Sequence, residues 1–326
     1  MAQLDSPIRF KPIFQYRIWG GVKLKTVLNK SVSTEKIGES WELSAVPNFE
    51  TTVAEGPLKG QTLSDLINTY QSKLVGKKVF QQFGNAFPLL IKFIDANKPL
   101  SVQVHPNDNW ARSRHNSFGK NEMWFVLDAA KDAELILGFN QELTKDQFTQ
   151  SLAAGTLTNL LHREKVARGD AFYIPTGLVH AIGAGIMLAE IQQTSDITYR
   201  IYDYDRIDPK SGTKRDLHIE EALAVANLAP APAYATHYTK SPNQAKTLVD
   251  SPYFKTRHLL VNGEMVQSYS DLDSFVILIG VAKHLTLIVN DQEITLSFGE
   301  VLFIPAAIKR IIFKGHQAEV IEVFMP

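Results

Sequence analysis

Two stretches of the sequence decide its fold: GDAFYIPTGLVH at residues 169–180 and LSVQVHPND at residues 100–108. The first places a glycine and an acid before an apolar segment that ends at a proline, with a second glycine and His180 after it. This order is typical of a turn, a strand and a second turn. In the other stretch, Gln103 and His105 are two residues apart on an extended segment, so their side chains project from the same face, about 6–7 Å apart. Both stretches predict strand ends that carry possible metal-binding groups.

Short strands also dominate the rest of the chain. Apolar and β-branched residues alternate or cluster between turn residues, as in ELILGF at 134–139 and FVILIGV at 275–281. Three segments instead place apolar residues at helical spacing, namely residues 61–83, 143–164 and 217–228. Thr62 and Thr144 are suitable N-caps for the first two. The predicted fold class is mainly β, with helical insertions.

The chain changes character between residues 228 and 245, where it contains three prolines and no sustained apolar period. This linker predicts a larger N-terminal domain at residues 1–240, which would hold the candidate metal-binding groups, and a smaller C-terminal domain at residues 241–326. An internal repeat agrees with the division, because residues 299–310 read GEVLFIPAAIKR and match residues 169–180 in their glycine, acid, apolar strand and proline. The second copy has Arg310 where the first has His180.

The composition excludes several classes of function. Among 326 residues, 34 Lys and Arg balance 34 Asp and Glu, so no global field attracts nucleic acid or an acidic membrane, and an anionic partner must be small. The absence of cysteine excludes disulfides, thiolate metal sites and cysteine nucleophiles. No apolar run approaches the roughly 20 residues that span a bilayer, and the first residues lack the apolar core of a secretory signal. We therefore expect a cytoplasmic protein; its oligomeric state is not predicted.

Four side chains form the candidate metal site: Gln103, His105, Glu122 and His180. Together they would offer two nitrogens and two oxygens to a first-row metal ion. On spacing alone, each has a plainer interpretation. A histidine at a strand end is more often a surface or structural residue, Glu122 alone would be a solvated acid, and glutamine is an uncommon ligand. The joint assignment depends on a resemblance.

The sequence resembles the cupins, and within them type I phosphomannose isomerase in its short bacterial form. Residues 169–180 fit the second cupin motif at every position, and QVHP at 103–106 has the Gln that these isomerases show where many cupins have His. The segments YRIWGG (16–21), GESWELS (38–44), KNEMWFVLD (120–128) and SDITYRIYDYDR (195–206) follow the family in order and spacing. The resemblance implies cupin-type jelly-roll barrels: a metal-binding N-terminal barrel and a smaller, metal-free C-terminal one.

The resemblance also implies a set of functional residues. Gln103, His105, Glu122 and His180 correspond to the ligands of one zinc ion per chain. Arg200 corresponds to an active-site arginine, and Lys120 to a lysine near the metal. The substrate phosphate would be bound by two further residues, Ser101 and Lys92. The implied reaction interconverts mannose 6-phosphate and fructose 6-phosphate through a cis-enediol.

Three of these residues have more than one possible role in the sequence. The guanidinium of Arg200 suits charge stabilisation better than proton abstraction, although it could also form a surface ion pair with a nearby Asp. Lys120 could serve as the base if burial lowers its pKa, with Asp196 and Glu42 as competitors. Lys92 could instead extend from its strand to solvent.

Two other functions compete with the isomerase. An iron-dependent cupin dioxygenase would use two His and one carboxylate, and a fourth ligand, Gln103, argues against it by closing a position that oxygen needs. A non-catalytic sugar-phosphate sensor would use the same pocket only for binding. The presence of Lys120 and Arg200 favours catalysis.

Overall fold

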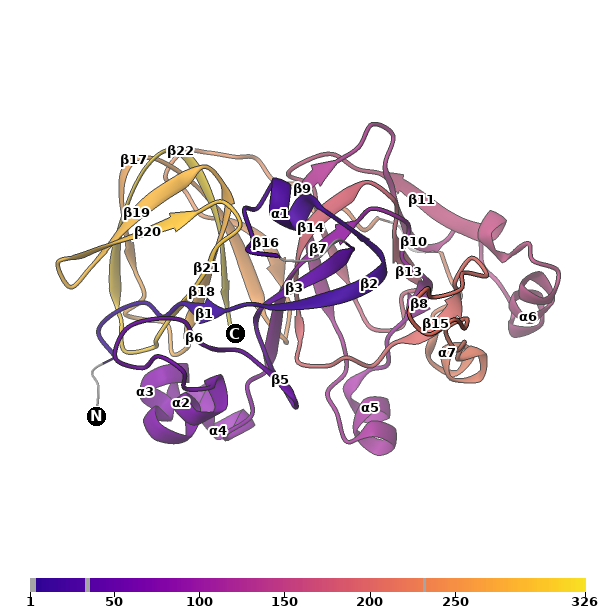
Figure 1. Cartoon of the computed structure of the whole chain (residues 1–326), viewed down its shortest axis with the longest axis horizontal. Coiled ribbons are helices and arrows are strands. Elements are labelled where there is room, and N and C mark those ends of the chain that lie inside the picture. The colour runs from indigo at the N-terminus through magenta and orange to yellow at the C-terminus, as the bar shows by residue number, and fades with distance from the viewer. Residues whose placement is uncertain (1–3, 33–35, 231–232) are drawn as a thin grey trace.

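The computed structural model describes residues 4–32, 36–230 and 233–326. Two β-rich units lie side by side, and most of the N-terminal segments, in indigo and magenta, form the unit opposite the yellow C-terminal strands (Figure 1). In the described part of the chain, no helix has the length and apolar character needed to cross a membrane.

The first unit contains two antiparallel sheets. A six-stranded sheet has the order β12-β9-β14-β7-β3-β2, and a five-stranded sheet has the order β11-β10-β13-β8-β15. The strands of the six-stranded sheet are β2 (Ile13–Gly21), β3 (Ile37–Leu43), β7 (Leu89–Ala96), β9 (Glu122–Ala129), β12 (Ala171–Ile174) and β14 (Ile186–Gln193). Those of the five-stranded sheet are β8 (Val102–Val104), β10 (Glu134–Phe139), β11 (Leu161–Lys165), β13 (His180–Ile182) and β15 (Tyr199–Tyr202).

The central strands β7 and β14 are buried on both faces, and their alternating side chains serve two cores. Phe93 of β7 and Ala189 of β14 join a cluster that includes Phe303 and Val323 of the C-terminal unit. Ile94, which follows Phe93 in β7, and its cross-strand partner Leu188, which precedes Ala189 in β14, belong to a second cluster inside the first unit. Because successive strand residues point to opposite faces, this sheet lies between the two cores.

The C-terminal unit is built on a seven-stranded antiparallel sheet. Its order is β16-β17-β22-β18-β21, with β19 beside β22 and β20 beside β19. The strands are β16 (Lys246–Asp250), β17 (Lys255–Ser268), β18 (Val276–Ala282), β19 (His284–Val289), β20 (Gln292–Ser297), β21 (Val301–Ile304) and β22 (Arg310–Phe324). All of them follow the predicted linker. The domain boundary at residue 240 remains a proposal. The two predicted units contact each other, because Ile8 pairs with Phe303 and the Thr236 hydroxyl donates to the Leu248 carbonyl at 3.1 Å.

The internal repeat forms the same turn, strand and turn twice. Strands β12 and β21 each follow a glycine with positive φ, 95° at Gly169 and 80° at Gly299. In both copies the next residue, an acid, accepts a hydrogen bond of 2.8 Å from the backbone N–H three residues before it. The predicted repeat is therefore confirmed as a structural one.

The helices differ in part from the prediction. Residues 61–83 form three short helices, α2 (Leu63–Tyr70), α3 (Ser72–Val75) and α4 (Lys77–Phe83). Thr62 and Thr144 cap α2 and α6 (Lys145–Ala153) through capping boxes, as expected. The helix predicted to run to residue 164 is wrong in its second half, because Gly155 has φ 68° after α6, a short 3-10 turn follows (Leu157–Leu160), and β11 then pairs with β10.

The remaining elements are short. The helix predicted at residues 217–228 is α7 (Ile219–Val225). Two helices were not predicted, α1 (Lys23–Thr26) and α5 (Asp108–His115), the latter capped by Asn107. Two small two-stranded ladders complete the fold: β1 (Phe10–Lys11) with β6 (Thr52–Val53), and β4 (Ala45–Val46) with β5 (Phe49–Glu50).

Candidate active site

Three predicted site residues lie side by side on neighbouring strands of the five-stranded sheet. Gln103 of β8 is opposite His180 of β13 on one side and Arg200 of β15 on the other. His105 follows two residues after Gln103, beyond the end of β8. Glu122 begins β9 in the other sheet and reaches the same place from across the unit. The strand ends of the two sheets therefore meet at this site.

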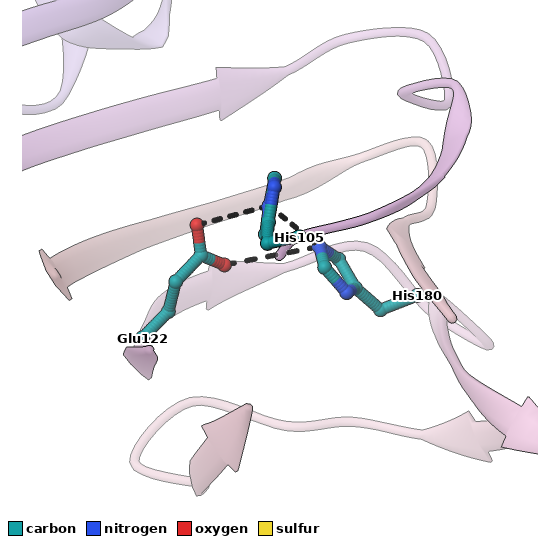
Figure 2. Close-up of side chains that lie close together, drawn as sticks. All are labelled: His105, Glu122 and His180. Atoms are coloured by element: carbon teal, nitrogen blue, oxygen red, sulfur yellow. Dashed lines mark hydrogen bonds and ion pairs between the residues drawn. The ribbon is translucent and has the colours of Figure 1, made fainter. Parts of the chain in front are cut away.

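His105, Glu122 and His180 point toward one another and are almost completely buried (Figure 2). The Nε2 atoms of the two histidines are 3.2 Å apart. Glu122 Oε1 lies 3.3 Å from His105 Nε2, and its Oε2 lies 3.8 Å from His180 Nε2. The candidate ligand atoms of the three residues all lie within 4.8 Å of one another. Gln103 belongs to the same group, with its Nε2 3.4 Å from His180 Nε2.

The hydrogen bonds of the histidines fit a divalent metal ion. His105 Nδ1 contacts the Ile197 carbonyl at 2.9 Å, and His180 Nδ1 contacts the Leu178 carbonyl at 2.8 Å. A ring nitrogen that faces a carbonyl must carry the proton, so each Nε2 presents a lone pair toward the other. Within the described residues, neither oxygen of Glu122 meets the geometry of a hydrogen bond, and Oε1 is in an ion pair with Lys120. Two lone pairs and a carboxylate that converge in a buried site form a donor set that suits such a cation.

The ionisation of the cluster is set by burial and by Lys120. Burial, assisted by Lys120, lowers the pKa of His105 to about 3, and burial also lowers the pKa of His180, so both rings are neutral. Burial alone would raise the pKa of Glu122, but the charge of Lys120 at contact distance outweighs it and holds that pKa well below its usual range. The site therefore presents neutral imidazoles and an ionised carboxylate, the forms that bind metals.

The pKa of Lys120 is not lowered, contrary to the expectation from its burial. Its Nζ lies 2.5 Å from Glu122 Oε1 and 3.2 Å from His105 Nε2. Burial does act to lower the pKa of Lys120, but the Glu122 carboxylate outweighs burial and the pKa is raised. Lys120 is therefore a cation in this arrangement, and the carboxylate at contact distance is the physical reason.

A cavity of about 400 Å³ opens beside this cluster. Its walls include the five predicted residues Lys92, Ser101, Gln103, Lys120 and Arg200. Gln103 and Lys120 thus belong both to the cavity wall and to the cluster of candidate ligands. The Ser101 hydroxyl lies 3.3 Å from Gln103 Oε1 and can donate a hydrogen bond to it. The cavity wall thus offers ammonium, guanidinium, hydroxyl and amide groups to a small molecule.

Arg200 lies in the cavity wall, and its side chain forms no ion pair with any residue that the structure describes. Its Nη1 donates to the Asp216 carbonyl at 2.9 Å, and its Nε is buried without a partner among the described residues. Asp203, a nearby acid that could have paired with it, instead binds Arg206 and Arg215. Burial and the nearby charge of Arg215 lower the pKa of Arg200 from its ordinary value. The side chain therefore forms part of the cavity wall, with its Nε unpaired among the described residues.

Lys92 is buried rather than extended to solvent, so the alternative of an exposed head group is wrong. Its Nζ lies 3.1 Å from Glu190 Oε1 and 5.1 Å from the centre of the Trp41 ring. Glu190 also accepts a hydrogen bond of 3.0 Å from Trp124 Nε1. Lys92 therefore reaches the cavity as one half of a buried ion pair.

The cavity also contains charged residues that the sequence reasoning missed. Arg17 binds Glu39 through two contacts, of 3.1 and 2.9 Å, and Trp41 Nε1 donates to Glu39 at 2.7 Å. Burial would raise the pKa of Glu39, but Arg17 and Lys92 outweigh it and lower that pKa to about 2. The signal was available in GESWEL, where Glu39 and Trp41 are two residues apart and share one face of a strand.

The two carboxylates considered as competing bases are now distinguished. Asp196 lines the cavity, on the segment between β14 and β15. Glu42 is absent from the cavity wall, and its carboxylate binds Lys30 at 2.7 Å and accepts from Ser40 at 2.5 Å. Asp196 is therefore in a position to act on a bound molecule, and Glu42 is not.

Paired antiparallel sheets around a buried cluster of two histidines and a glutamate define a protein of the cupin fold with a candidate metal centre. Residues 8–139 match the family described as phosphomannose isomerase type I, catalytic domain. The chain is 40% identical to a probable mannose-6-phosphate isomerase of Bacillus subtilis (strain 168), over 80% of this chain and 81% of that protein. It is 35% identical to the mannose-6-phosphate isomerase of Streptococcus mutans, over 96% of both. The chain belongs to the type I phosphomannose isomerase family.

Solved structures agree with this assignment. The crystal structure of the mannose 6-phosphate isomerase from Bacillus subtilis superposes with a TM-score of 0.86 at 33% identity, covering 98% of this chain and 99% of that one. A putative mannosephosphate isomerase from Archaeoglobus fulgidus has a TM-score of 0.81 at 20% identity, and this likeness shows the fold alone.

Proposed function

We propose that the chain interconverts mannose 6-phosphate and fructose 6-phosphate as a metal-dependent aldose–ketose isomerase. The observation that carries the proposal is the convergence of His105, Glu122 and His180 beside a cavity. Arg200 and Lys120 line that cavity. The size of the cavity, about 400 Å³, suits a small polar molecule. The names of the relatives supply the substrate, and the site supplies groups suited to the reaction.

The proposed metal is one zinc ion, held by Gln103, His105, Glu122 and His180. When bound, such an ion acts as a Lewis acid for the sugar oxygens, and it needs no redox chemistry to do so. The chain itself prepares the site. The carbonyls of Ile197 and Leu178 fix which nitrogen of each histidine carries the proton, and burial keeps both rings neutral.

The reaction moves a proton between C1 and C2 of the sugar through a cis-enediol, and the chain must stabilise negative charge on the sugar oxygens meanwhile. Arg200 is proposed for this role because its guanidinium stays protonated and the side chain lines the cavity. Lys120 is proposed as the second catalytic residue. Lys120 is a cation that lines the cavity beside Glu122, which supports a role as proton donor to a sugar oxygen. Asp196 also lines the cavity and is the candidate base.

The substrate phosphate is proposed to bind Ser101 and Lys92. Both line the cavity, and the Ser101 hydroxyl can donate to an anion if it leaves Gln103. Lys92 would serve the phosphate in competition with Glu190, at 3.1 Å. Anchoring the far end of the sugar lets binding energy orient C1 and C2 beside the catalytic groups.

Two alternatives give different results. A dioxygenase would consume oxygen with iron, and a sensor would bind fructose 6-phosphate without exchanging its C1 or C2 hydrogen with solvent. The test is elemental analysis of the purified protein combined with a coupled assay of mannose 6-phosphate conversion, before and after chelation. We expect about one metal ion per chain and activity that disappears on chelation and returns with zinc. Conversion that is unaffected by complete metal removal would contradict the proposal.

A further inference from the structure

A buried amide pair, Asn121 and Gln193, lies directly behind the candidate metal site. Asn121 is 2% exposed and Gln193 is 6% exposed. Gln193 Oε1 accepts from Asn121 N–H at 3.0 Å and from Asn121 Nδ2 at 2.7 Å. Asn121 stands between Lys120 and Glu122, whose side chains meet on the opposite face of the extended chain. The pair therefore fixes the backbone from which two residues of the site project.

The same pair reaches the segment that carries His180. Asn121 Oδ1 accepts from the Thr176 N–H at 3.1 Å and from the Tyr173 hydroxyl at 3.2 Å. Thr176 belongs to the turn between β12 and β13, and His180 begins β13. The carbonyl oxygen of one asparagine thus links the chain that carries Glu122 to the turn that leads to His180.

Gln193 extends the connection to the segment that carries His105. Its Nε2 donates to Asp108 Oδ1 at 3.0 Å, and the same oxygen accepts from Gly119 N–H at 2.8 Å. Asp108 begins α5, three residues after His105. Two backbone bonds complete the frame, from Lys120 N–H to the Pro106 carbonyl at 3.2 Å and from Gly177 N–H to the His105 carbonyl at 2.9 Å. All three ligand-bearing segments meet at these two amides.

We propose that Asn121 and Gln193 are positioning residues, which hold Glu122, Lys120 and the two histidines at the spacing that binds the metal. The proposal rests on the metal site of the proposed function. Removing one of these buried amides costs more than its own hydrogen bonds. The polar groups that it leaves unpaired are also buried and cannot form hydrogen bonds with water instead. Removing either amide lets the three segments drift apart, and ligand atoms that are displaced by a fraction of an ångström bind a metal less tightly.

The test measures metal binding directly. The variants are Asn121→Ala, Gln193→Met, which keeps the side-chain volume, and the two together. Ser274→Ala is the matched control, because Ser274 is 3% exposed, donates to the Phe275 carbonyl at 2.8 Å and accepts from Met325 N–H at 3.0 Å, all in the C-terminal unit. Each protein is stripped of metal and titrated with Co²⁺ in competition with a chelator, while its visible spectrum and its thermal unfolding are recorded.

We expect each single variant to bind Co²⁺ about 10–100-fold more weakly, which is the range for residues that support metal ligands. Its visible bands should also change. The double variant should be little weaker than the worse single one, because the two amides act as a unit. Ser274→Ala should lose comparable thermal stability and keep its Co²⁺ affinity. Native affinity and spectrum in Asn121→Ala and Gln193→Met, or an equal loss of affinity in Ser274→Ala, would overturn the proposal.

Two outcomes separate this inference from the proposed function. If the native chain binds Co²⁺ but does not convert mannose 6-phosphate, the proposed reaction fails, and the comparison of affinities still decides the role of the amides. If Asn121→Ala does not fold, Gln193→Met tests the same pair from its other side, because it leaves the bonds to Thr176 and Tyr173 in place.

Discussion

The two copies of the internal repeat share a backbone and differ in chemistry. In the first unit Ile174 is opposite Glu122, and in the C-terminal sheet Ile304 is opposite Val276. His180 is opposite Gln103, and Arg310 is opposite Ser268. Three of the four proposed ligand positions therefore have counterparts that are occupied by Val, Arg and Ser.

The C-terminal copy fills the corresponding space with apolar packing. Val276, Ile304 and Ile308 belong to one buried hydrophobic cluster. The turn, strand and turn form equally well there, with the same glycine conformation and the same bond to the acid. The fold of the C-terminal copy therefore forms without the amide, the acid or the His180 imidazole, so their presence in the first unit reflects the function of that site.

The largest loss of stability is expected when the glutamate of the first copy, Glu122, is introduced at the matching position of the C-terminal copy, Val276. Val276→Glu buries a carboxylate in an apolar cluster without a cation, and an unpaired buried charge costs roughly 3–5 kcal/mol of unfolding free energy. Urea denaturation of the variant at neutral pH measures this loss. A stable variant that also gains a second metal ion would show instead that the C-terminal copy retains a latent site, and the contrast between the copies would fail.

Removing an imidazole from the first copy tests the opposite side of the comparison. His180→Ala should lower metal content and turnover together. The fall in turnover should be about 10²-fold or more, which exceeds the effect of removing a residue that only supports a ligand. The fold should persist, because the C-terminal copy forms the same strand end without a histidine. Metal analysis, turnover and circular dichroism of one preparation check the three statements. Full activity would remove His180 from the site.

Arg200→Ala should separate catalysis from metal binding. Arg200 is beside Gln103 in the sheet but takes no part in the metal cluster, so metal content should stay at the native level. Turnover should fall by about 10²-fold, as expected for the loss of one charge-stabilising donor. Steady-state kinetics with metal analysis decide the matter. Unchanged turnover would assign Arg200 a structural role only.

The sequence was sufficient for the features that are local. The glycine, acid and proline of the repeat, the caps at Thr62 and Thr144 and the alternation of Gln103 with His105 each have a short-range cause, and the structure contains them. The family resemblance supplied the metal ligands, which come from strands of two sheets and which spacing alone did not join.

Long-range pairing was outside the reach of the sequence. The raised pKa of Lys120 depends on a carboxylate at 2.5 Å, and the burial of Lys92 depends on Glu190, 98 residues away. The strand at Leu161–Lys165 was mistaken for helix because its pairing with β10 outweighs a helical pattern of leucines. Such features are set by tertiary contacts, which no local pattern contains.

The smallest effects concern two buried glutamates, one in each unit, whose pKa values move in opposite directions. Burial would raise the pKa of Glu39, but Arg17 and Lys92 outweigh it and lower that pKa to about 2, so its stabilising contribution is full above its ordinary value of 4.5 and disappears as the pH falls from 4.5 to 2. Burial raises the pKa of Glu322 despite Arg257, so the folded state takes up a proton first and gains stability as the pH falls toward 4.5.

Replacing each glutamate should therefore change the pH dependence of the unfolding free energy with opposite sign. Glu39→Gln should flatten the loss between pH 4.5 and 2 by at most about 1.4 kcal/mol per pH unit, the value for one proton. Arg17→Met should flatten it similarly, because it removes the main partner of Glu39. Glu322→Gln should instead abolish a gain on acidification from neutral pH toward 4.5. Urea titrations across this range measure both slopes, and equal slopes in native protein and Glu39→Gln would show that the Arg17 pair contributes nothing to acid stability.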